Sequence, residues 1–437
     1  MEFIKSEILA REALEIMPGP HSNLPGYELI KPVYITHGKG AHVYDVDGND
    51  YIDYICGAGS GILGYGNQEY LQNIKEQIDK IYFLENCRRN PLEIELARKL
   101  IKYIPSAEKV RYLLSGTEAV QLAIRLSRAY TKRNLFIRFD GHYHGWLDNV
   151  LGGNPSTNLD APPYGFEKPE DIFKTYGRDT HSLEQSFKII WNDIDFLEKV
   201  LEKYGDKIAM IIMEPVNCNG GCCWPKKGYL ERVRQLCDKY GIVLCFDEII
   251  TGFRMGLGGA QKLLGVTPDI STFGKGIAGG IPFSAVVGKS KIMDLLYQRK
   301  VIGAGTFNAY PLGMAAAVST INILEKNNGE FYRNCEEKQK MLVDGLKNIS
   351  KKLGIKMLIQ AVSGCLFFQF TDIDIANNMG EWFCCSDHEK QERFRKGLFE
   401  EGLFILFRGR WYVSGALKDN DIERTLKAVE KVMKSIS

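Results

Sequence analysis

The sequence predicts an α/β fold in which a mainly parallel sheet is covered by helices on both faces. Apolar strands are expected at 135–139, 208–213, 242–246 and 269–273. Segments with helical periodicity lie around them, at 92–103, 117–131, 194–204 and 228–240. Strands that alternate with helices pair in parallel, because each helix returns the chain to the same end of the sheet. The chain has 437 residues, 45% of them hydrophobic, so it can bury such a core.

The segments outside this alternation predict the remaining elements. A helix is expected from Glu2 to Met17, before a Pro/Gly-rich stretch. The β-rich runs 41–45 and 51–54 flank an Asp-Gly turn and are typical of a hairpin. A long helix is expected from Leu312 to Lys326, and the last third mixes helices with short strands. We therefore divide the chain into a large domain (66–325) and a smaller α+β domain (326–437), which an N-terminal segment (1–65) joins.

Residues 152–187 interrupt the alternation. They are rich in Gly, Pro, Asn, Asp and Thr and show no clear period. A loop this long inside a compact domain is often a lid or a binding loop. A surface excursion with a little helix fits the composition equally well, so both interpretations stay open.

Charge and cysteine content indicate which kinds of molecule the protein binds and in which compartment it lies. The 56 basic and 54 acidic side chains leave a net charge of +2, and no charged block predicts nucleic-acid or membrane binding. Eleven cysteines, an odd number with adjacent pairs, do not form a disulfide framework or a zinc motif. We expect a cytoplasmic protein with reduced thiols, no signal peptide and no membrane-spanning helix, which acts on small molecules.

Lys275 is the most informative residue of the chain. It lies between two glycines just after the run 269–273, and Asp247 ends the run 242–246. A lysine and an acid at strand ends suit pyridoxal phosphate, because the amine forms a Schiff base with the cofactor aldehyde. The carboxylate keeps the pyridine nitrogen protonated. Most lysines are solvated surface charges, but these neighbours favour a catalytic pair.

Two small polar segments before helices could bind the cofactor phosphate. Ser115, Gly116 and Thr117 precede the helical segment 117–131. Ser115 is a plausible cap, Gly116 allows close approach to the backbone, and a helix N-terminus favours an anion. Thr306 offers a hydroxyl before the next long helix. Each motif alone is weak support, since small polar caps precede most helices.

Polar and aromatic residues also follow the other strands. Tyr143, after the run 135–139, could stack on a flat ring, or it could simply belong to the core. Its histidine neighbours lack a third ligand at suitable spacing, so we predict no metal site. Trp146 is a further candidate substrate contact. Asn219 lies in the polar cluster after 208–213, and Ile249 could pack against the ring face.

In this order the motifs resemble the class III (ω-type) aminotransferases of pyridoxal-phosphate fold type I. The resemblance is nearest to the glutamate-1-semialdehyde 2,1-aminomutases and extends from about Tyr34 to Leu426. The segments that carry it are 114–119, 140–145, 246–254 and 273–275. The resemblance implies a large domain with a mainly parallel seven-stranded sheet and a smaller α+β domain.

The resemblance also implies roles for single residues. Lys275 would carry the Schiff base and shuttle the proton, and Asp247 would pair with the pyridine nitrogen. Tyr143 and Ile249 would cover opposite ring faces, and Asn219 would lie near the cofactor 3′-oxygen. The phosphate contacts would come from Gly116, Thr117 and, across a homodimer with shared active sites, from the neighbouring subunit's Thr306.

Two departures from the aminomutase pattern concern the substrate. The N-terminal segment 23–27 lacks the arginine that binds the substrate carboxylate, and Gly409 replaces a glutamate between Arg408 and Arg410. A bidentate arginine carries energy and orientation, so its loss weakens carboxylate recognition. Either Arg408 or Arg410 relocates the anion site, or the acceptor is neutral, such as a keto or aldehyde sugar. Plain surface exposure of both arginines is the alternative.

The sequence therefore predicts a transaminase that moves an amino group from an amine donor to an oxo acceptor. The first alternative is the glutamate-1-semialdehyde 2,1-aminomutase reaction, against which the two departures argue. A second alternative, of another class, is a catalytically silent binding protein on the same scaffold. The presence of both Lys275 and Asp247 argues against that one. No Gly-x-Ser-x-Gly elbow supports a hydrolase.

Overall fold

The computed structural model describes residues 1–19, 30–85, 88–153, 175–179, 181–406 and 409–436. The chain divides into two compact units. Unit 1 comprises Met1–Gln68, Glu330–Ala376 and Glu381–Ser437, and unit 2 comprises Glu69–Gly329 with Asn377–Gly380. No helix in the described ranges is long and apolar enough to cross a membrane.

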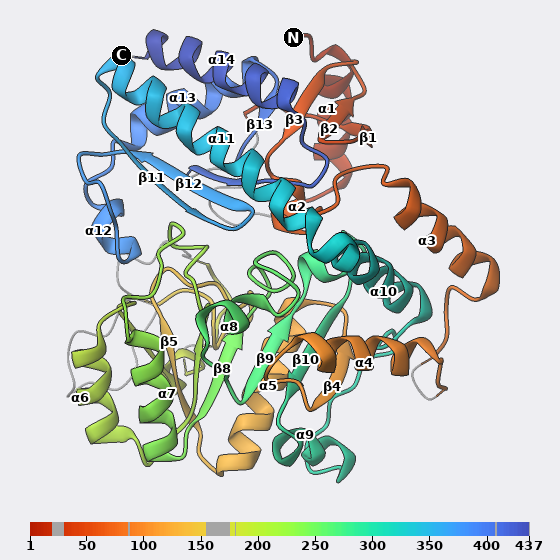
Figure 1. Ribbon diagram of the computed structural model, residues 1–437, viewed down its shortest axis with the longest axis vertical. Coiled ribbons are helices and arrows are strands. Elements are labelled where there is room, and N and C mark those ends of the chain that lie inside the picture. The colour runs from red at the N-terminus through yellow and green to blue at the C-terminus, as the bar shows by residue number, and fades with distance from the viewer. Residues whose placement is uncertain (20–29, 86–87, 154–174, 180, 407–408, 437) are drawn as a thin grey trace. The chain divides into compact units, whose positions relative to one another are not determined.

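The described part of unit 2 is built on a seven-stranded sheet (Figure 1). In spatial order its strands are β4 (Lys109–Leu113), β10 (Ser284–Gly288), β9 (Ile270–Phe273), β8 (Val243–Asp247), β7 (Ile208–Met213), β5 (Leu135–Phe139) and β6 (Ser186–Ile189). Among these strands β10 alone runs in the opposite direction to the rest, antiparallel to both β4 and β9. The other six therefore end at the same edge of the sheet, and the predicted α/β fold with a mainly parallel sheet is confirmed.

Helices cover this sheet and bury its central strands completely. The described helices of this part of the chain are α3 (Gln68–Lys80), α4 (Leu92–Tyr103), α5 (Gly116–Thr131), α6 (Ile194–Tyr204), α7 (Tyr229–Tyr240), α8 (Gly259–Leu264), α9 (Ser290–Tyr297) and α10 (Pro311–Glu325). Every residue of β7 and β8 is buried, which requires cover on both faces. On one face Val120 and Ala123 of α5 share a core with Met210, Val243 and Ile270.

Unit 1 contains two smaller sheets. The first consists of β1 (Ile35–Lys39), β2 (His42–Asp45), β3 (Asp50–Asp53) and β13 (Leu403–Phe404), and the second of β11 (Met357–Val362), β12 (Cys365–Phe370) and β14 (Arg410–Tyr412). The accompanying helices are α1 (Ile4–Ile16), α2 (Cys56–Gly59), α11 (Glu330–Leu353), α12 (Met379–Phe383), α13 (His388–Glu400) and α14 (Asp419–Ser435). Leu342, Phe368, Phe394, Trp411 and Val429 lie in its core.

The predicted N-terminal helix, the hairpin at 41–54 and the helix from 312 are confirmed, as are the four apolar strands and the helices around them. The strands β4, β6 and β10 were missed. In β4 polar and apolar residues alternate and its first residue is exposed, because it lies at the edge of the sheet, so no apolar run marks it. Most of the segment predicted as a lid or surface excursion, 154–174 and 180, lies outside the described residues. Its end forms a 3₁₀ turn (Leu183–Gln185) and the start of β6.

Candidate active site

The predicted site residues of unit 2 follow strands that end at one edge of the sheet. Tyr143 follows β5, Asn219 follows β7, Asp247 ends β8 and Lys275 follows β9. In open α/β sheets, ligands bind outside the carboxyl ends of the strands. The antiparallel strand β10 begins at this edge, where Ser284 pairs with the last residue of β4. The turn 115–117, which follows β4, therefore lies at the same edge.

Asp247 is buried and held on three sides. Its Oδ2 accepts a hydrogen bond from His144 Nδ1 at 2.7 Å. Its Oδ1 accepts from Thr272 Oγ1 at 3.2 Å and from the Ile249 amide at 3.1 Å. Both side chains of the His144–Asp247 pair are almost fully buried. His144 Nε2 is also buried and has no hydrogen-bond partner among the described residues. The carboxylate is thus fixed in position before any ligand binds.

Glu214, at the end of β7, links two of the predicted site segments. Its carboxylate accepts the Tyr143 amide at 2.9 Å and the Asn219 side-chain amide at 2.7 Å. Its own amide donates to His142 Nδ1 at 2.9 Å. Burial raises the pKa of Glu214 against the effect of these hydrogen bonds, and the negative charge of Asp247 acts in the same direction as burial.

The sequence prediction did not assign a role to Glu214 or to His144. A signal was available for Glu214, which is an acid directly after a continuous apolar strand. His142, which Glu214 contacts, has a pKa well below its usual value because of burial and the nearby His144 and Lys188. The ring of His142 is therefore neutral, as its role as an acceptor at Nδ1 requires.

The turn at the start of α5 is anchored on both sides. Ser115 and Glu118 form a capping box, in which Ser115 Oγ accepts the Glu118 amide and the Glu118 carboxylate accepts the Ser115 amide. Ser284 Oγ donates to the Ser115 carbonyl at 2.8 Å. A Cβ on Gly145 would lie 2.7 Å from Thr117 Oγ1, so the loop after β5 reaches this turn. The first amides of α5 are free of intrahelical bonds and favour an anion.

Lys275 has an unusual backbone conformation. Its φ of +47° lies in the left-handed region, which costs a residue with a side chain about 1–3 kcal/mol. Such strain persists where the surrounding structure imposes it and is common at functional sites. The preceding Gly274 leaves little room, because a Cβ there would lie 3.0 Å from Ile249 Cδ1. A Cβ on Gly116 would lie 3.1 Å from the same atom, so Ile249 joins the lysine segment to the start of α5.

The remaining predicted residues lie apart from these contacts or outside the described chain. Thr306 is exposed in the loop before α10, and Trp146 is 64% exposed after Gly145. Arg410 belongs to β14 of unit 1, where its guanidinium lies 5.5 Å from the centre of the Tyr412 ring. Arg408 and the segment 23–27 lie outside the described residues. No group of three metal-ligand side chains occurs in the ranges that the structure describes.

The residues at the sheet edge fit pyridoxal phosphate. The fixed carboxylate of Asp247 suits a protonated ring nitrogen, and Lys275 follows the strand beside it. Gly116 opens the backbone at a helix N-terminus, which suits the phosphate. Ile249 lies against Gly116 and Gly274, and the Tyr143 backbone is held by Glu214.

Comparison with known proteins shows which protein family the chain belongs to. The sequence model of the family described as Aminotransferase class-III matches residues 25–433. A glutamate-1-semialdehyde 2,1-aminomutase of Thermodesulfovibrio yellowstonii is 35% identical over 443 residues, covering 100% of both chains. A protein of the same name from Sulfolobus acidocaldarius is 39% identical over 411 residues, covering 93% of each chain.

Solved structures resemble this fold along nearly the whole chain. An omega-transaminase from Sphaerobacter thermophilus has a TM-score of 0.89 at 27% identity, covering 99% of this chain and 97% of its own. A glutamate-1-semialdehyde aminomutase from Pseudomonas aeruginosa has a TM-score of 0.86 at 19% identity, covering 99% and 95%. The second likeness concerns the fold alone.

Proposed function

Because this chain belongs to the class III aminotransferases, pyridoxal-phosphate enzymes of fold type I, we propose that Lys275 and Asp247 catalyse an amino-group transfer between small molecules. The observation that carries this proposal is the fixed, buried Asp247 at the end of β8, with Lys275 directly after the neighbouring strand β9. A catalytically silent binding protein would not need this pair.

The reaction requires a proton to leave one carbon atom and return to another. Pyridoxal phosphate, when bound, supplies an electron-withdrawing ring that stabilises the negative charge left on the substrate carbon. Lys275 would hold the cofactor through its aldehyde. With its amine free, Lys275 would act as the general base that takes the proton from the substrate carbon and as the acid that returns it.

The surrounding residues position the cofactor for this proton transfer. Asp247 would keep the ring nitrogen protonated, and His144 holds the carboxylate in place. Tyr143 and Ile249 would cover the two faces of the ring. Glu214 fixes the Tyr143 backbone and the Asn219 side chain, and Asn219 would lie near the cofactor 3′-oxygen.

The start of α5 would hold the cofactor phosphate. Gly116 and Thr117 would bind it through their backbone amides and the Thr117 hydroxyl. The hydroxyl of Ser115 is already used in the capping box, so Ser115 contributes by shaping the turn. Thr306, exposed before α10, completes the site of a second subunit in a homodimer.

Glutamate-1-semialdehyde is the first substrate to test. Relatives named glutamate-1-semialdehyde 2,1-aminomutase are similar to this chain over 93–100% of its length, at 35–39% identity for the two described above. We propose this intramolecular transfer as the leading reaction. A keto or aldehyde sugar acceptor, expected from the sequence, finds no support among these relatives.

Transamination between two molecules is the second candidate. Its support is the sequence itself, since segment 23–27 has no arginine and Gly409 stands between two arginines where the aminomutases carry a glutamate. An omega-transaminase is also among the structures that this chain resembles. In this reading Arg408 and Arg410 are candidate substrate contacts, and Trp146 is a third.

Cofactor absorbance tests the proposal directly. Purified protein mixed with pyridoxal phosphate should show the visible band of lysine-bound cofactor, and Lys275→Ala should lose both this band and at least about 10²-fold in rate. Lys300→Ala, a change of an exposed lysine of the same unit, should keep both. Wild-type protein without the band, or Lys275→Ala with an unchanged band, would contradict the assignment.

Substrate consumption then separates the two reactions. Protein loaded with cofactor receives glutamate-1-semialdehyde alone, with no second amine or carbonyl compound. Conversion to the isomer with its amino group moved from carbon 2 to carbon 1 supports the aminomutase reaction. Absence of conversion, together with turnover of an amine donor and a separate oxo acceptor, supports the transaminase.

A further inference from the structure

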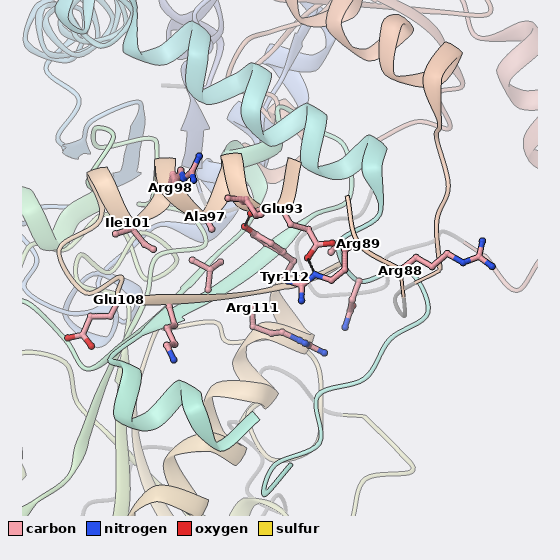
Figure 2. A pocket seen from close by; sticks show the side chains of 14 residues that line it. Arg88, Arg89, Glu93, Ala97, Arg98, Ile101, Glu108, Arg111 and Tyr112 are labelled. Atoms are coloured by element: carbon pink, nitrogen blue, oxygen red, sulfur yellow. Dashed lines mark hydrogen bonds and ion pairs between the residues drawn. The ribbon is translucent and has the colours of Figure 1, made fainter. Parts of the chain in front are cut away.

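A cavity of about 520 Å³ lies in unit 2, and its lining includes none of the predicted active-site residues. Its walls are α4 and the edge strand β4, with Asn308 and Ala309 completing the lining (Figure 2). A space of this size suits a small organic molecule. Ile94, Ala97 and Ile101 give the α4 wall an apolar surface.

The charged residues that line this cavity are mostly basic. Five described lining residues are basic and two are acidic: Arg88, Arg89, Arg98, Lys109 and Arg111 against Glu93 and Glu108. Figure 2 shows Arg88 and Arg98 extending away from the space between α4 and β4. The basic residues that remain candidates for a ligand are therefore Arg89, Lys109 and Arg111.

The two acidic residues already accept hydrogen bonds from other residues. Glu93 accepts Arg89 Nε at 3.1 Å and the Asn90 amide at 3.0 Å. Glu108 accepts the Ser290 amide at 2.7 Å at the start of α9. Lys109 is likewise paired, with Asp294 on α9. Of the three candidate cations, Arg111 is therefore the one whose positive charge is least neutralised by a nearby carboxylate.

Arg111 is half-buried, and its guanidinium makes only some of the hydrogen bonds that it can make. One of its terminal nitrogens, Nη2, donates to the Gly303 carbonyl at 2.5 Å. Its Nε is buried and has no hydrogen-bond partner in the part of the chain that the structure describes. Burial lowers the pKa of this guanidinium, Glu93 opposes that effect, and the nearby Arg89 adds to it. An anion in the cavity would offset the desolvation and the repulsion together.

Asn308 provides a second, independent observation. Its side chain is only 4% exposed, and it lines the same cavity. Neither Nδ2 nor Oδ1 has a hydrogen-bond partner among the described residues. Buried amide groups without partners are rare in folded proteins, because each loses its hydrogen bonds to water. A ligand that both accepts and donates a hydrogen bond would satisfy both atoms.

We propose that this cavity binds a hydroxylated oxyanion, a small molecule with a phosphate or carboxylate group beside a hydroxyl group. Arg111 and Asn308 Nδ2 donate to the charged oxygens, and Asn308 Oδ1 accepts from the hydroxyl. Arg89, 84% exposed at its side chain, adds charge at the mouth. This site is separate from the cofactor phosphate turn at the start of α5.

Calorimetric titration of the cofactor-loaded enzyme tests the proposal. Loading keeps the cofactor's own phosphate site filled, so added anions report on the second site. The probes are citrate, glucose 6-phosphate and inorganic phosphate. We expect saturable binding of citrate or glucose 6-phosphate with one site per chain, and weaker binding of inorganic phosphate, which lacks an organic body. The preferred organic probe distinguishes a carboxylate from a phosphate ligand.

Variants decide whether the bound probe uses the named residues. Asn308→Asp keeps the size of the side chain but adds negative charge, and Arg111→Gln removes the buried cation. Each should weaken binding roughly tenfold, as expected for a lost hydrogen bond to a charged group. Arg125→Gln, which removes an exposed charge of α5 outside the cavity lining, should change affinity less than about twofold.

Arg89→Gln tests the site even if the buried variants do not fold, since its exposed side chain can change without disturbing the core. It should weaken binding about threefold, as loss of a salt-screened surface charge implies. Absence of saturable binding to the wild type for all three probes overturns the proposal. Equal losses in Arg125→Gln and Arg111→Gln overturn it as well, because they indicate diffuse attraction without a built site.

Discussion

Two histidine–aspartate clusters, one in each unit, differ in how many of the histidine ring nitrogens have a hydrogen-bond partner. In unit 1, His42 lies between two carboxylates, with Nδ1 2.6 Å from Asp50 and Nε2 3.0 Å from Asp421. In unit 2, His144 uses Nδ1 for Asp247 at 2.7 Å, and its Nε2 has no partner among the described residues. Both ring nitrogens are used in the first cluster, which is complete as it stands.

The difference indicates what each cluster does. His42 joins the β2–β3 hairpin to α14 and is one-fifth exposed at its side chain, so it stabilises the unit 1 fold. Both side chains of the His144–Asp247 pair are almost fully buried, and Asp247 has further polar partners in the turn after its strand and on β9. A buried, rigid carboxylate at a strand end is costly for stability and useful for catalysis. The predictions below test this contrast.

The largest effect is expected from Asp247→Asn. The amide has the same size but no charge, so it cannot hold the ring nitrogen of the cofactor in its protonated state. We expect kcat to fall by about 10²–10³-fold, the size of losing one electrostatic contact to the reacting group. Steady-state rates, and the pH dependence of the bound cofactor's visible absorbance, measure this. Circular dichroism should show an unchanged fold, and a kcat within tenfold of wild type would rule out the assigned role.

His144→Phe sharpens the comparison. Phenylalanine keeps an aromatic ring in the pocket but removes the hydrogen bond to Asp247. The carboxylate then loses one of its three partners, and kcat/KM should fall about 10–100-fold, as for a lost hydrogen bond to a charged group. Because His144 acts through Asp247, the absorbance spectrum of the bound cofactor should also change its pH dependence. A variant with lower stability but an unchanged spectrum would show that His144 is only structural.

The location of Asp247 and Lys275 could be predicted, but their partners could not. Asp247 ends the apolar run that becomes β8, and Lys275 follows the segment that becomes β9, whose apolar residues are mixed with Ser271 and Thr272. Both segments are recognisable as strands because they have the length of buried strands. His144 lies after β5, and the sheet order β8-β7-β5 places one strand between it and Asp247. Strand order is set by long-range packing and is not visible in one sequence. The contact of Glu214 with Tyr143 depends on the same order, because it joins the segments that follow β7 and β5.

The edge strand β4 and the cavity beside it could not be predicted from sequence patterns. β4 reads Lys-Val-Arg-Tyr-Leu, and its mixed polarity follows from its edge position, where part of the strand faces solvent. The α4–β4 cavity could not be foreseen, since Arg111 and Asn308 are almost 200 positions apart in the sequence and meet only through the fold.

The smallest effect concerns His42 and the pH dependence of stability. Burial lowers the pKa of His42, but the hydrogen bonds to Asp421 and Asp50 and their negative charges outweigh it, so the folded-state pKa is raised above 6.5. A raised pKa means that the folded state holds the proton more tightly than the unfolded state. The stabilisation is therefore complete below the unfolded-state pKa near 6.5, and it is lost as the pH rises through the folded-state pKa.

His42→Gln should remove this dependence, because glutamine does not titrate. Urea unfolding followed by tryptophan fluorescence at pH 6 should show a loss of no more than about 1 kcal/mol, the scale of a partly exposed ion pair. At a pH well above the folded-state pKa the variant and the wild type should differ less. The absorbance of bound cofactor should stay as in the wild type, in contrast to His144→Phe. A stability difference that grows with pH would reverse the sign of the linkage and show that His42 is neutral in the folded protein.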